Sequence, residues 1–150
     1  TGYKFNFTEL DNGIVFKDDN LTVEAFKVNH GEFEDAYGFR FTSKDKVIVF
    51  SGDTGPSKSL ESYAKDADIL VHEVYSYAGF LKKTKDWQIY HKSHHTSTYE
   101  VGEIASRAKP KLLVLSHILF WGADEQDILE ETRTTFSGNI KIAEDLMVIK

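Results

Sequence analysis

Two kinds of hydrophobic pattern divide the chain near residue 53. Before that point, short runs rich in β-branched and aromatic residues are separated by the polar turns "DNG", "KDDN" and "SKDK", which is typical of strands that pair with their neighbours in sequence. The runs that predict strands are "KFNFTEL", "GIVFKD", "LTVEAFKVNH", "YGFRFTS" and "KVIVFSG". We therefore expect residues 3 to 50 to form a largely antiparallel sheet.

After residue 53, predicted helices alternate with predicted strands. The pattern predicts helices over residues 57–67, 98–108 and 123–136, and strands at "DILVHEVY", "KLLVLSHI" and "IKIAEDLMVIK". We interpret the aromatic and basic stretch "FLKKTKDWQIYHKSHH" as a loop. The alternation indicates an α/β fold. Because the sequence contains no repeat, low-complexity tract or Gly/Ser linker, we expect a single segment over residues 1–150.

Composition limits the kinds of site that this fold can carry. A chain of 150 residues that is 41% hydrophobic can bury one core. It has no cysteine, so His, Asp or Glu must supply the ligands of any metal site. The formal net charge of −6 argues against broad coating of nucleic acid but leaves a local basic patch open. No apolar run approaches the ~20 residues of a membrane span, and "TGYKFNF" matches neither a signal nor a transit peptide. We therefore expect a soluble, cytoplasmic chain.

The stretch "VIVFSGDTGPSKS" places one carboxylate, Asp53, where a buried strand ends and a helix is about to begin. Asp53 could cap the helix or turn, or it could belong to a functional site. A third interpretation is a phosphate-binding loop, because "GDTGPSKS" differs from the G-x-x-x-x-G-K-[ST] pattern at one position, Ser57. Pro56 removes a backbone N–H, and Asp53 would place negative charge where phosphate binds, so the sequence disfavours that loop.

Histidines gather at the ends of the predicted elements. They are His30, His72, His95 and His117. In α/β sheets ligands bind beyond the carboxyl ends of the strands, so Asp53, Glu73 and His117 are expected to converge at one edge. Imidazole and carboxylate groups suit a metal or an acid/base site. A single histidine at a strand end is more often structural, and it is the combination of Asp53 with His117 that favours a site.

The ordered segments "VNHGEFEDAYGFRF", "VIVFSGDT", "ADILVHEVY", "HHTSTYEVGEIASRAKPKLLVLSH" and "IKIAEDLMVI" resemble the metallo-β-lactamase superfamily, in particular ribonuclease Z and arylsulfatase-like hydrolases. This resemblance implies a four-layer αββα sandwich that binds two divalent metal ions, expected to be zinc, with manganese or iron as alternatives. It implies that Asp53 bridges the metals and that His117 binds one of them. It also implies that His95 acts on the leaving group, that Glu73 supports His95, and that His30 lies near the site.

The first metal motif of that family, H-x-H-x-D-H, has no match in this chain. We therefore expect residues 1–150 to be the C-terminal half of the sandwich, inactive by itself. Its sheet would then present an apolar helix-free face through residues such as Val15, Phe26, Phe39 and Val49. That face would be covered by the missing N-terminal half or by a second copy in a homodimer.

The resemblance implies a metal-dependent hydrolase that attacks phosphodiesters or similar anionic esters with a metal-activated hydroxide. The lysine-rich stretch before His95, with Trp87 and Tyr90 interleaved, suits an anionic ester that carries an aromatic or base ring, such as RNA, and a solvated loop is an equal alternative. We expect His30, Lys92 and His94 to contact that substrate. A sulfatase-type ester hydrolase remains an alternative, as does a metal-free relic of the fold that serves as a binding or assembly module.

Overall fold

A computed structural model describes residues 2–4 and 6–149 as one seven-stranded sheet flanked by helices. The strands follow one another across the sheet in the order of the sequence. They are β1 (Gly13–Lys17), β2 (Leu21–Lys27), β3 (Tyr37–Ser43), β4 (Val47–Phe50), β5 (Ile69–Tyr75), β6 (Leu112–Leu119) and β7 (Ile140–Ile142). The pairings from β1 to β4 are antiparallel, and those from β4 to β7 are parallel. This division confirms the change of pattern expected near residue 53.

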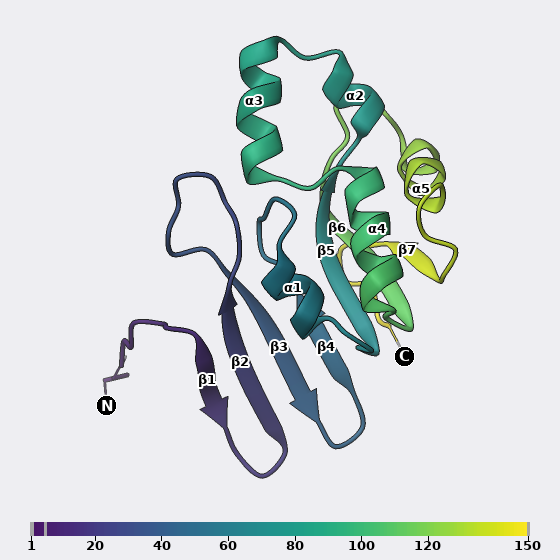
Figure 1. Cartoon of the computed structure of the whole chain (residues 1–150). Coiled ribbons are helices and arrows are strands. Elements are labelled where there is room, and N and C mark those ends of the chain that lie inside the picture. The colour runs from purple at the N-terminus through teal and green to yellow at the C-terminus, as the bar shows by residue number, and fades with distance from the viewer. Residues whose placement is uncertain (1, 5, 150) are drawn as a thin grey trace.

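Three helices cover one face of the sheet, as Figure 1 shows. They are α1 (Lys58–Tyr63), α4 (Thr98–Ala108) and α5 (Glu125–Arg133). Their apolar side chains share one core with the strands, and its fully buried members include Phe26, Val49, Leu60, Leu70, Val101, Ile104, Leu113 and Ile128. Because the parallel strands are joined through these helices, the core lies between the helices and this single face.

The "FLKKTKDWQIYHKSHH" stretch is helical, so its interpretation as a loop was wrong. Its residues fall mostly in α2 (Tyr77–Leu81) and α3 (Lys85–His94), which lie beyond one end of the sheet (Figure 1). Aromatic and histidine rings are spaced at helical intervals in α3: Trp87 packs on His91, and Tyr90 stacks on His94. This i, i+4 spacing is the signal that would have predicted the helix.

Other predicted elements are shorter than expected or absent, among them helix 123–136, which contracts to α5 (Glu125–Arg133). Residues 6–10 of "KFNFTEL" form no strand, and residue 5 lies outside the described residues. Helix 57–67 contracts to α1, while the last strand contracts to β7 because the chain turns at Leu146, which has a φ of 63°. Helix 98–108 is confirmed as α4.

The second face of the sheet is apolar and carries no helix among the described residues. Tyr37, Phe39, Phe41, Phe50 and Val71 line an open hollow of about 390 Å³ there, and the Phe41 and Phe50 rings are 5.6 Å apart. Phe39 therefore lies where it was expected. Phe26 and Val49 were misassigned, because the alternation of side chains along β2 and β4 turns them into the core under the helices.

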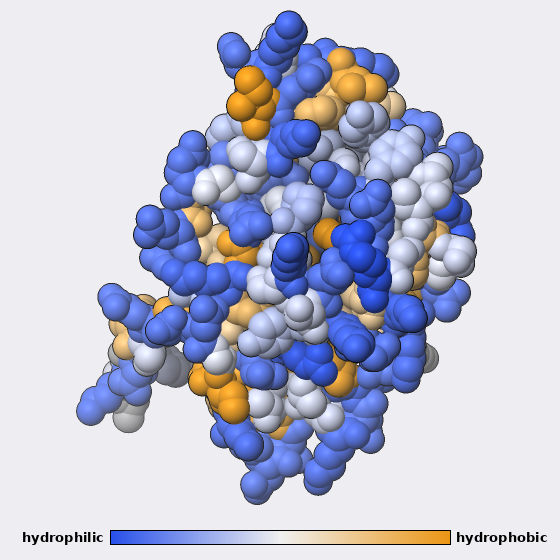
Figure 2. All heavy atoms as spheres, in the orientation of Figure 1, coloured by the Kyte–Doolittle hydropathy of each residue, from blue (hydrophilic) through white to orange (hydrophobic). Residues whose placement is uncertain are grey.

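The helix-covered face has the opposite character. Figure 2 shows a mainly hydrophilic surface on which apolar residues form separate small patches. No helix within residues 2–4 and 6–149 has the length and hydropathy needed to span a membrane.

Candidate active site

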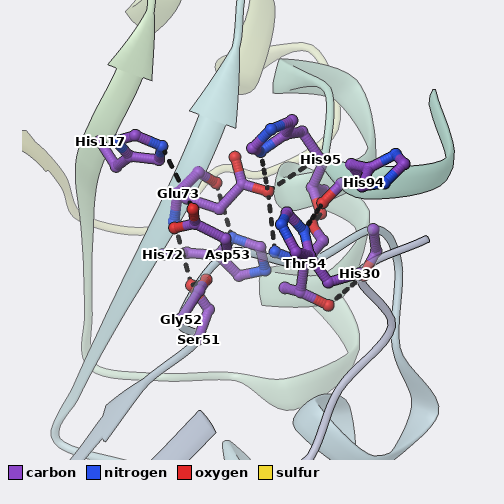
Figure 3. Close-up of polar contacts among 12 residues, drawn as sticks. His30, Ser51, Gly52, Asp53, Thr54, His72, Glu73, His94, His95 and His117 are labelled. Carbon is purple, nitrogen blue, oxygen red and sulfur yellow. Dashed lines mark hydrogen bonds and ion pairs between the residues drawn. The ribbon is translucent and has the colours of Figure 1, made fainter. Parts of the chain in front are cut away.

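Asp53 is held at the end of β4 by a turn that requires glycine at residue 52. Gly52 has a φ of +62°, and a Cβ there would come within 2.5 Å of the Tyr37 carbonyl oxygen. A side chain would therefore push the turn away from β3. The N-terminal cap of α1 is Ser57, whose side chain accepts a hydrogen bond from the Leu60 N–H. Asp53 is thus not the helix cap, and its carboxylate faces His117 instead (Figure 3).

His117 reaches the same edge through a bulge in β6. The β5–β6 register pairs Glu73 with Ser116 and Val74 with Ile118, so His117 is an extra residue, and its φ is 43°. A bulge of this kind turns a side chain out of the regular alternation. The His117 Nε2 lies 3.6 Å from the Asp53 Oδ2, and both side chains are about half exposed.

Glu73 lies on β5 between these residues and the helices, and it is almost completely buried. Its Oε1 accepts hydrogen bonds from the backbone N–H groups of Thr54 (3.2 Å) and Thr96 (2.9 Å). Its Oε2 is buried and has no hydrogen-bond partner among the described residues. Burial raises the pKa of Glu73, although the bonds to its carboxylate oppose that shift.

His95 follows α3 directly and faces the Glu73 carboxylate. Its Nδ1 is 3.4 Å from the Glu73 Oε1, and its ring lies 6.0 Å from the His117 ring. Burial works to lower the pKa of His95, but the carboxylates of Glu73 and Asp53 outweigh it, so that the pKa is raised. His95 can therefore carry a proton. Its Nδ1 faces Glu73, and its other ring nitrogen, Nε2, remains available to a ligand.

His30 and His94 differ in what they offer to a substrate. His30 Nδ1 bonds the His94 carbonyl oxygen at 2.8 Å, and the His30 ring lies 5.4 Å from the His95 ring. His94 is buried, with Nδ1 2.7 Å from the Tyr90 carbonyl oxygen and Nε2 3.1 Å from the Glu32 carboxylate. Both nitrogens of His94 are occupied, so its ring joins α3 to the loop that contains Glu32.

His72 is completely buried beside this site and titrates far from neutrality. Its Nδ1 lies 2.6 Å from the Glu73 carbonyl oxygen, while its Nε2 has no partner among the described residues. Burial lowers the pKa of His72 to about 4. His72 is therefore neutral at physiological pH, with Nδ1–H donating to the carbonyl, and it supports β5 without joining the acid/base pair.

Sequence reasoning missed a row of rings that leads away from His95. The His91 ring lies 5.6 Å from that of His95, and Trp121 lies 4.7 Å from His91. Trp121 in turn lies 5.4 Å from Tyr75. Both ring nitrogens of His91 are buried and unpaired among the described residues. The helical spacing of His91 and His95 could have predicted their contact, whereas the distant Trp121 gave no local signal.

The donors at the sheet edge fit a divalent metal in kind but not in number. Asp53 and His117 supply a carboxylate oxygen and an imidazole nitrogen, half exposed and close together, which are ligands of zinc, manganese and iron. Among the described residues no group of three His, Asp or Glu side chains is arranged to hold a metal. A complete site would need ligands from outside these residues.

The chain is similar in sequence to a described family and to several known proteins. A family described as "Beta-lactamase superfamily domain" matches residues 3–118. Ribonuclease Z of Archaeoglobus fulgidus is 36% identical over 108 residues, covering 71% of this chain and 33% of that protein. Ribonuclease Z of Bacillus velezensis is 26% identical over 199 residues, covering 98% of this chain and 62% of that protein.

The fold comparison leads to the same group. The metallo-beta-lactamase fold protein YhfI from Bacillus subtilis superposes with a TM-score of 0.73 at 23% identity, covering 90% of this chain and 52% of YhfI. At that identity the similarity shows the fold alone. The α/β class predicted from the sequence is confirmed. The chain spans between about a third and two thirds of the length of these relatives.

Proposed function

This chain belongs to the metallo-β-lactamase superfamily, and from that premise we propose that the intact protein is a metal-dependent hydrolase of phosphodiesters or similar anionic esters, similar to ribonuclease Z. The observation that carries the proposal is the juxtaposition of two carboxylate–imidazole pairs. Asp53 with His117 and Glu73 with His95 meet at the carboxyl edge of β4, β5 and β6, as Figure 3 shows.

The two pairs are suited to different tasks because their surroundings differ. Asp53 and His117 are half exposed and would hold the divalent metals. Two such ions, when bound, supply a water of lowered pKa and polarise the ester. Their remaining ligands would come from another part of the protein, in agreement with the proposal that residues 1–150 form the C-terminal half of the αββα domain.

The buried pair, Glu73 and His95, would carry out the proton transfer. Glu73 is fixed by two backbone N–H groups, so it holds the Nδ1 side of His95 in one orientation. Burial opposes protonation of His95, but the Glu73 carboxylate outweighs it and raises the pKa of His95, which favours the protonated imidazole. His95 would donate that proton to the leaving oxygen, a contribution typically worth ~10² to 10⁴ in rate.

The charge of the stretch that precedes His95 in the sequence supports an anionic substrate. Lys82, Lys83, Lys85 and Lys92 lie within residues 80–95 with a single acidic residue, Asp86, although the whole chain has a formal net charge of −6. Lys92 lines a pocket and the His30 ring lies 5.4 Å from the His95 ring, which supports a contact of both with the substrate. His94 is occupied by its own partners. RNA is the substrate class that the names of the relatives suggest, and a sulfatase-type ester remains the competing substrate.

One observation favours a second candidate, a metal-free relic of the fold that binds or assembles. The described residues offer only Asp53 and His117 at the exposed edge, with no third ligand in place. The two candidates differ in metal content. We therefore propose elemental analysis of the purified intact protein together with hydrolysis of bis(4-nitrophenyl) phosphate; a protein without metal that leaves the ester intact would favour the relic.

Two variants separate the roles of the pairs. Asp53→Ala should remove most of the bound metal and nearly all hydrolysis, because it takes away the carboxylate that, with the His117 imidazole, would hold the metal. His95→Ala should keep the metal and slow turnover, most for esters with poor leaving groups. Full metal occupancy in Asp53→Ala would show that Asp53 is not a ligand.

A further inference from the structure

The structure contains an aromatic pocket in which the proposed hydrolysis uses only one lining residue, Lys92. It has a volume of about 450 Å³, within the range of small-molecule sites. Its walls come from β5, α2, α3 and α4, and it is lined by Tyr75, Tyr77, Phe80, Lys92, Ser97, Tyr99 and Glu100. This pocket is separate from the hollow beside Asp53 and His117, with which it shares no lining residue.

The aromatic walls are packed against one another. Tyr77 and Tyr99 meet edge to face at 5.1 Å, and Phe80 lies 5.1 Å from Tyr75 and 5.9 Å from Tyr77. Tyr75 and Phe80 are buried, while Tyr77 is 37% exposed. The pocket thus has a fixed apolar floor and partly open tyrosine rings at its edge, which is the arrangement that a flat ring can stack on.

Hydrogen bonds from Glu131 of α5 fix the two tyrosine-bearing elements relative to each other. The Glu131 carboxylate accepts hydrogen bonds from the Tyr77 and Ala78 N–H groups, each at 2.9 Å, and from the Thr98 hydroxyl at 2.6 Å. Tyr77 begins α2, and Thr98 begins α4 next to Tyr99. The pocket is therefore held open by the fold before any ligand arrives.

Polar groups supply a cation and hydrogen-bonding atoms at the same pocket. Lys92 is exposed, and among the described residues no carboxylate lies within ion-pair distance of it. The Glu100 Oε2 accepts from the Ser97 N–H and hydroxyl, which leaves Oε1 as an available acceptor. An anion with an attached ring that carries N–H donors would satisfy Lys92 and Glu100 together.

The pocket adjoins the proposed chemistry. The Tyr75 N–H donates to the carbonyl oxygen of Thr96, the residue after His95, at 2.9 Å. Tyr75 also lies two residues beyond Glu73 on β5. The row of rings from Tyr75 through Trp121 and His91 ends at His95. The pocket is therefore connected to the residue that would protonate the leaving group, through the backbone bond at Thr96 and through this row of rings.

We infer that this pocket binds the nucleobase next to the scissile phosphodiester, with the base against the tyrosine rings, its N–H donors toward Glu100 and its phosphate toward Lys92. The inference rests on the proposed function, because it names the part of the substrate that lies on the leaving-group side. Any base has a flat face to stack, so the pocket would favour nucleotides over base-free phosphates.

Calorimetric titration of the intact protein with nucleoside 5′-monophosphates, ribose 5-phosphate, phenyl phosphate and inorganic phosphate tests the inference. Nucleotides should bind at least about tenfold more tightly than ribose 5-phosphate, the increment expected of one stacked base. Equal affinity for the two would overturn the inference, and so would phenyl phosphate binding as tightly as the nucleotides, since the pocket would then accept any aromatic ring.

Variants test whether the higher affinity for nucleotides comes from the pocket. Tyr99→Ala should lose about tenfold in nucleotide affinity, and Lys92→Glu, at an exposed position that leaves the fold undisturbed, should weaken nucleotide binding in a salt-dependent way. Tyr3→Ala, which changes a tyrosine that is 94% exposed outside the pocket, is the matched control and should bind as the parent does. Thermal unfolding confirms that each variant is folded, and unchanged binding by both pocket variants would refute the assignment.

The two proposals can fail separately. Hydrolysis of bis(4-nitrophenyl) phosphate reports the metal-dependent chemistry, whereas the affinity difference between nucleotide and ribose 5-phosphate reports the pocket. An active enzyme without that difference would overturn the base pocket alone. A protein that prefers nucleotides but hydrolyses no ester would overturn the hydrolase proposal alone.

Discussion

Two substitutions of Glu73 distinguish the effect of its negative charge from the effect of the hydrogen bonds that its oxygen atoms accept. The side chain is 3% exposed, and one oxygen accepts from the N–H groups of Thr54 and Thr96. In Glu73→Ala both buried N–H groups lose their acceptor. At about 1–3 kcal/mol for each unsatisfied group, the free energy of unfolding should fall by about 2–6 kcal/mol. Loss of an unfavourably buried carboxylate offsets part of this cost.

Glu73→Gln is the matched variant, because its amide oxygen can keep both backbone hydrogen bonds. Its free energy of unfolding should lie much closer to that of the parent protein. The amide has no charge to stabilise the His95 imidazolium, so the pKa of His95 should fall. If protonated His95 is the acid, the alkaline limb of the pH–rate profile should move to lower pH.

Two measurements check this pair of variants. Urea unfolding at pH 7 gives the stabilities, and the pH dependence of ester hydrolysis gives the apparent pKa of the acid. If Glu73→Gln is as unstable as Glu73→Ala, the oxygen contacts are not what stabilises this site. An unshifted alkaline limb in Glu73→Gln would refute the role of Glu73 in setting the protonation of His95.

Other predictions follow from buried and apolar groups. His72 has a pKa of about 4 in the folded protein, against 6.5 for an unperturbed histidine, so its contribution to stability is complete above pH 6.5 and is lost as the pH falls toward 4. This amounts to about 3 kcal/mol, and His72→Gln should remove that part of the pH dependence in denaturant titrations. Phe41→Asp should destabilise the intact protein by at least about 2 kcal/mol if the helix-free face is covered; a change as small as that of Tyr3→Ala in thermal unfolding would show that the face is open to water. Gly52→Ala should lower both the free energy of unfolding and the metal content, because its Cβ would meet the Tyr37 carbonyl. If the turn does not position Asp53, metal analysis and unfolding would give the same values as for the parent protein.

The sequence by itself determined the elements whose local signals agree with their surroundings. The parallel strands were predicted because they appear as continuous apolar runs. Helix α4 was predicted with the bounds that it has in the structure, where Ser97 and Glu100 form a capping box at its start. Convergence of Asp53, Glu73 and His117 followed from a general property of α/β sheets. All three side chains line the same hollow.

Only the tertiary structure decided how those side chains are oriented and what surrounds them. The bulge at His117 depends on its register with β5, and the burial of Glu73 depends on N–H groups from two distant segments. Phe26 and Val49 were assigned to the wrong face of the sheet. Alternation along a strand shows which residues share a face, but it does not show which face the helices cover. The aromatic pocket joins four separate elements, so no local stretch of sequence contained it. Contacts between residues far apart in the chain arise from packing. They could be identified in the sequence only once the fold was known.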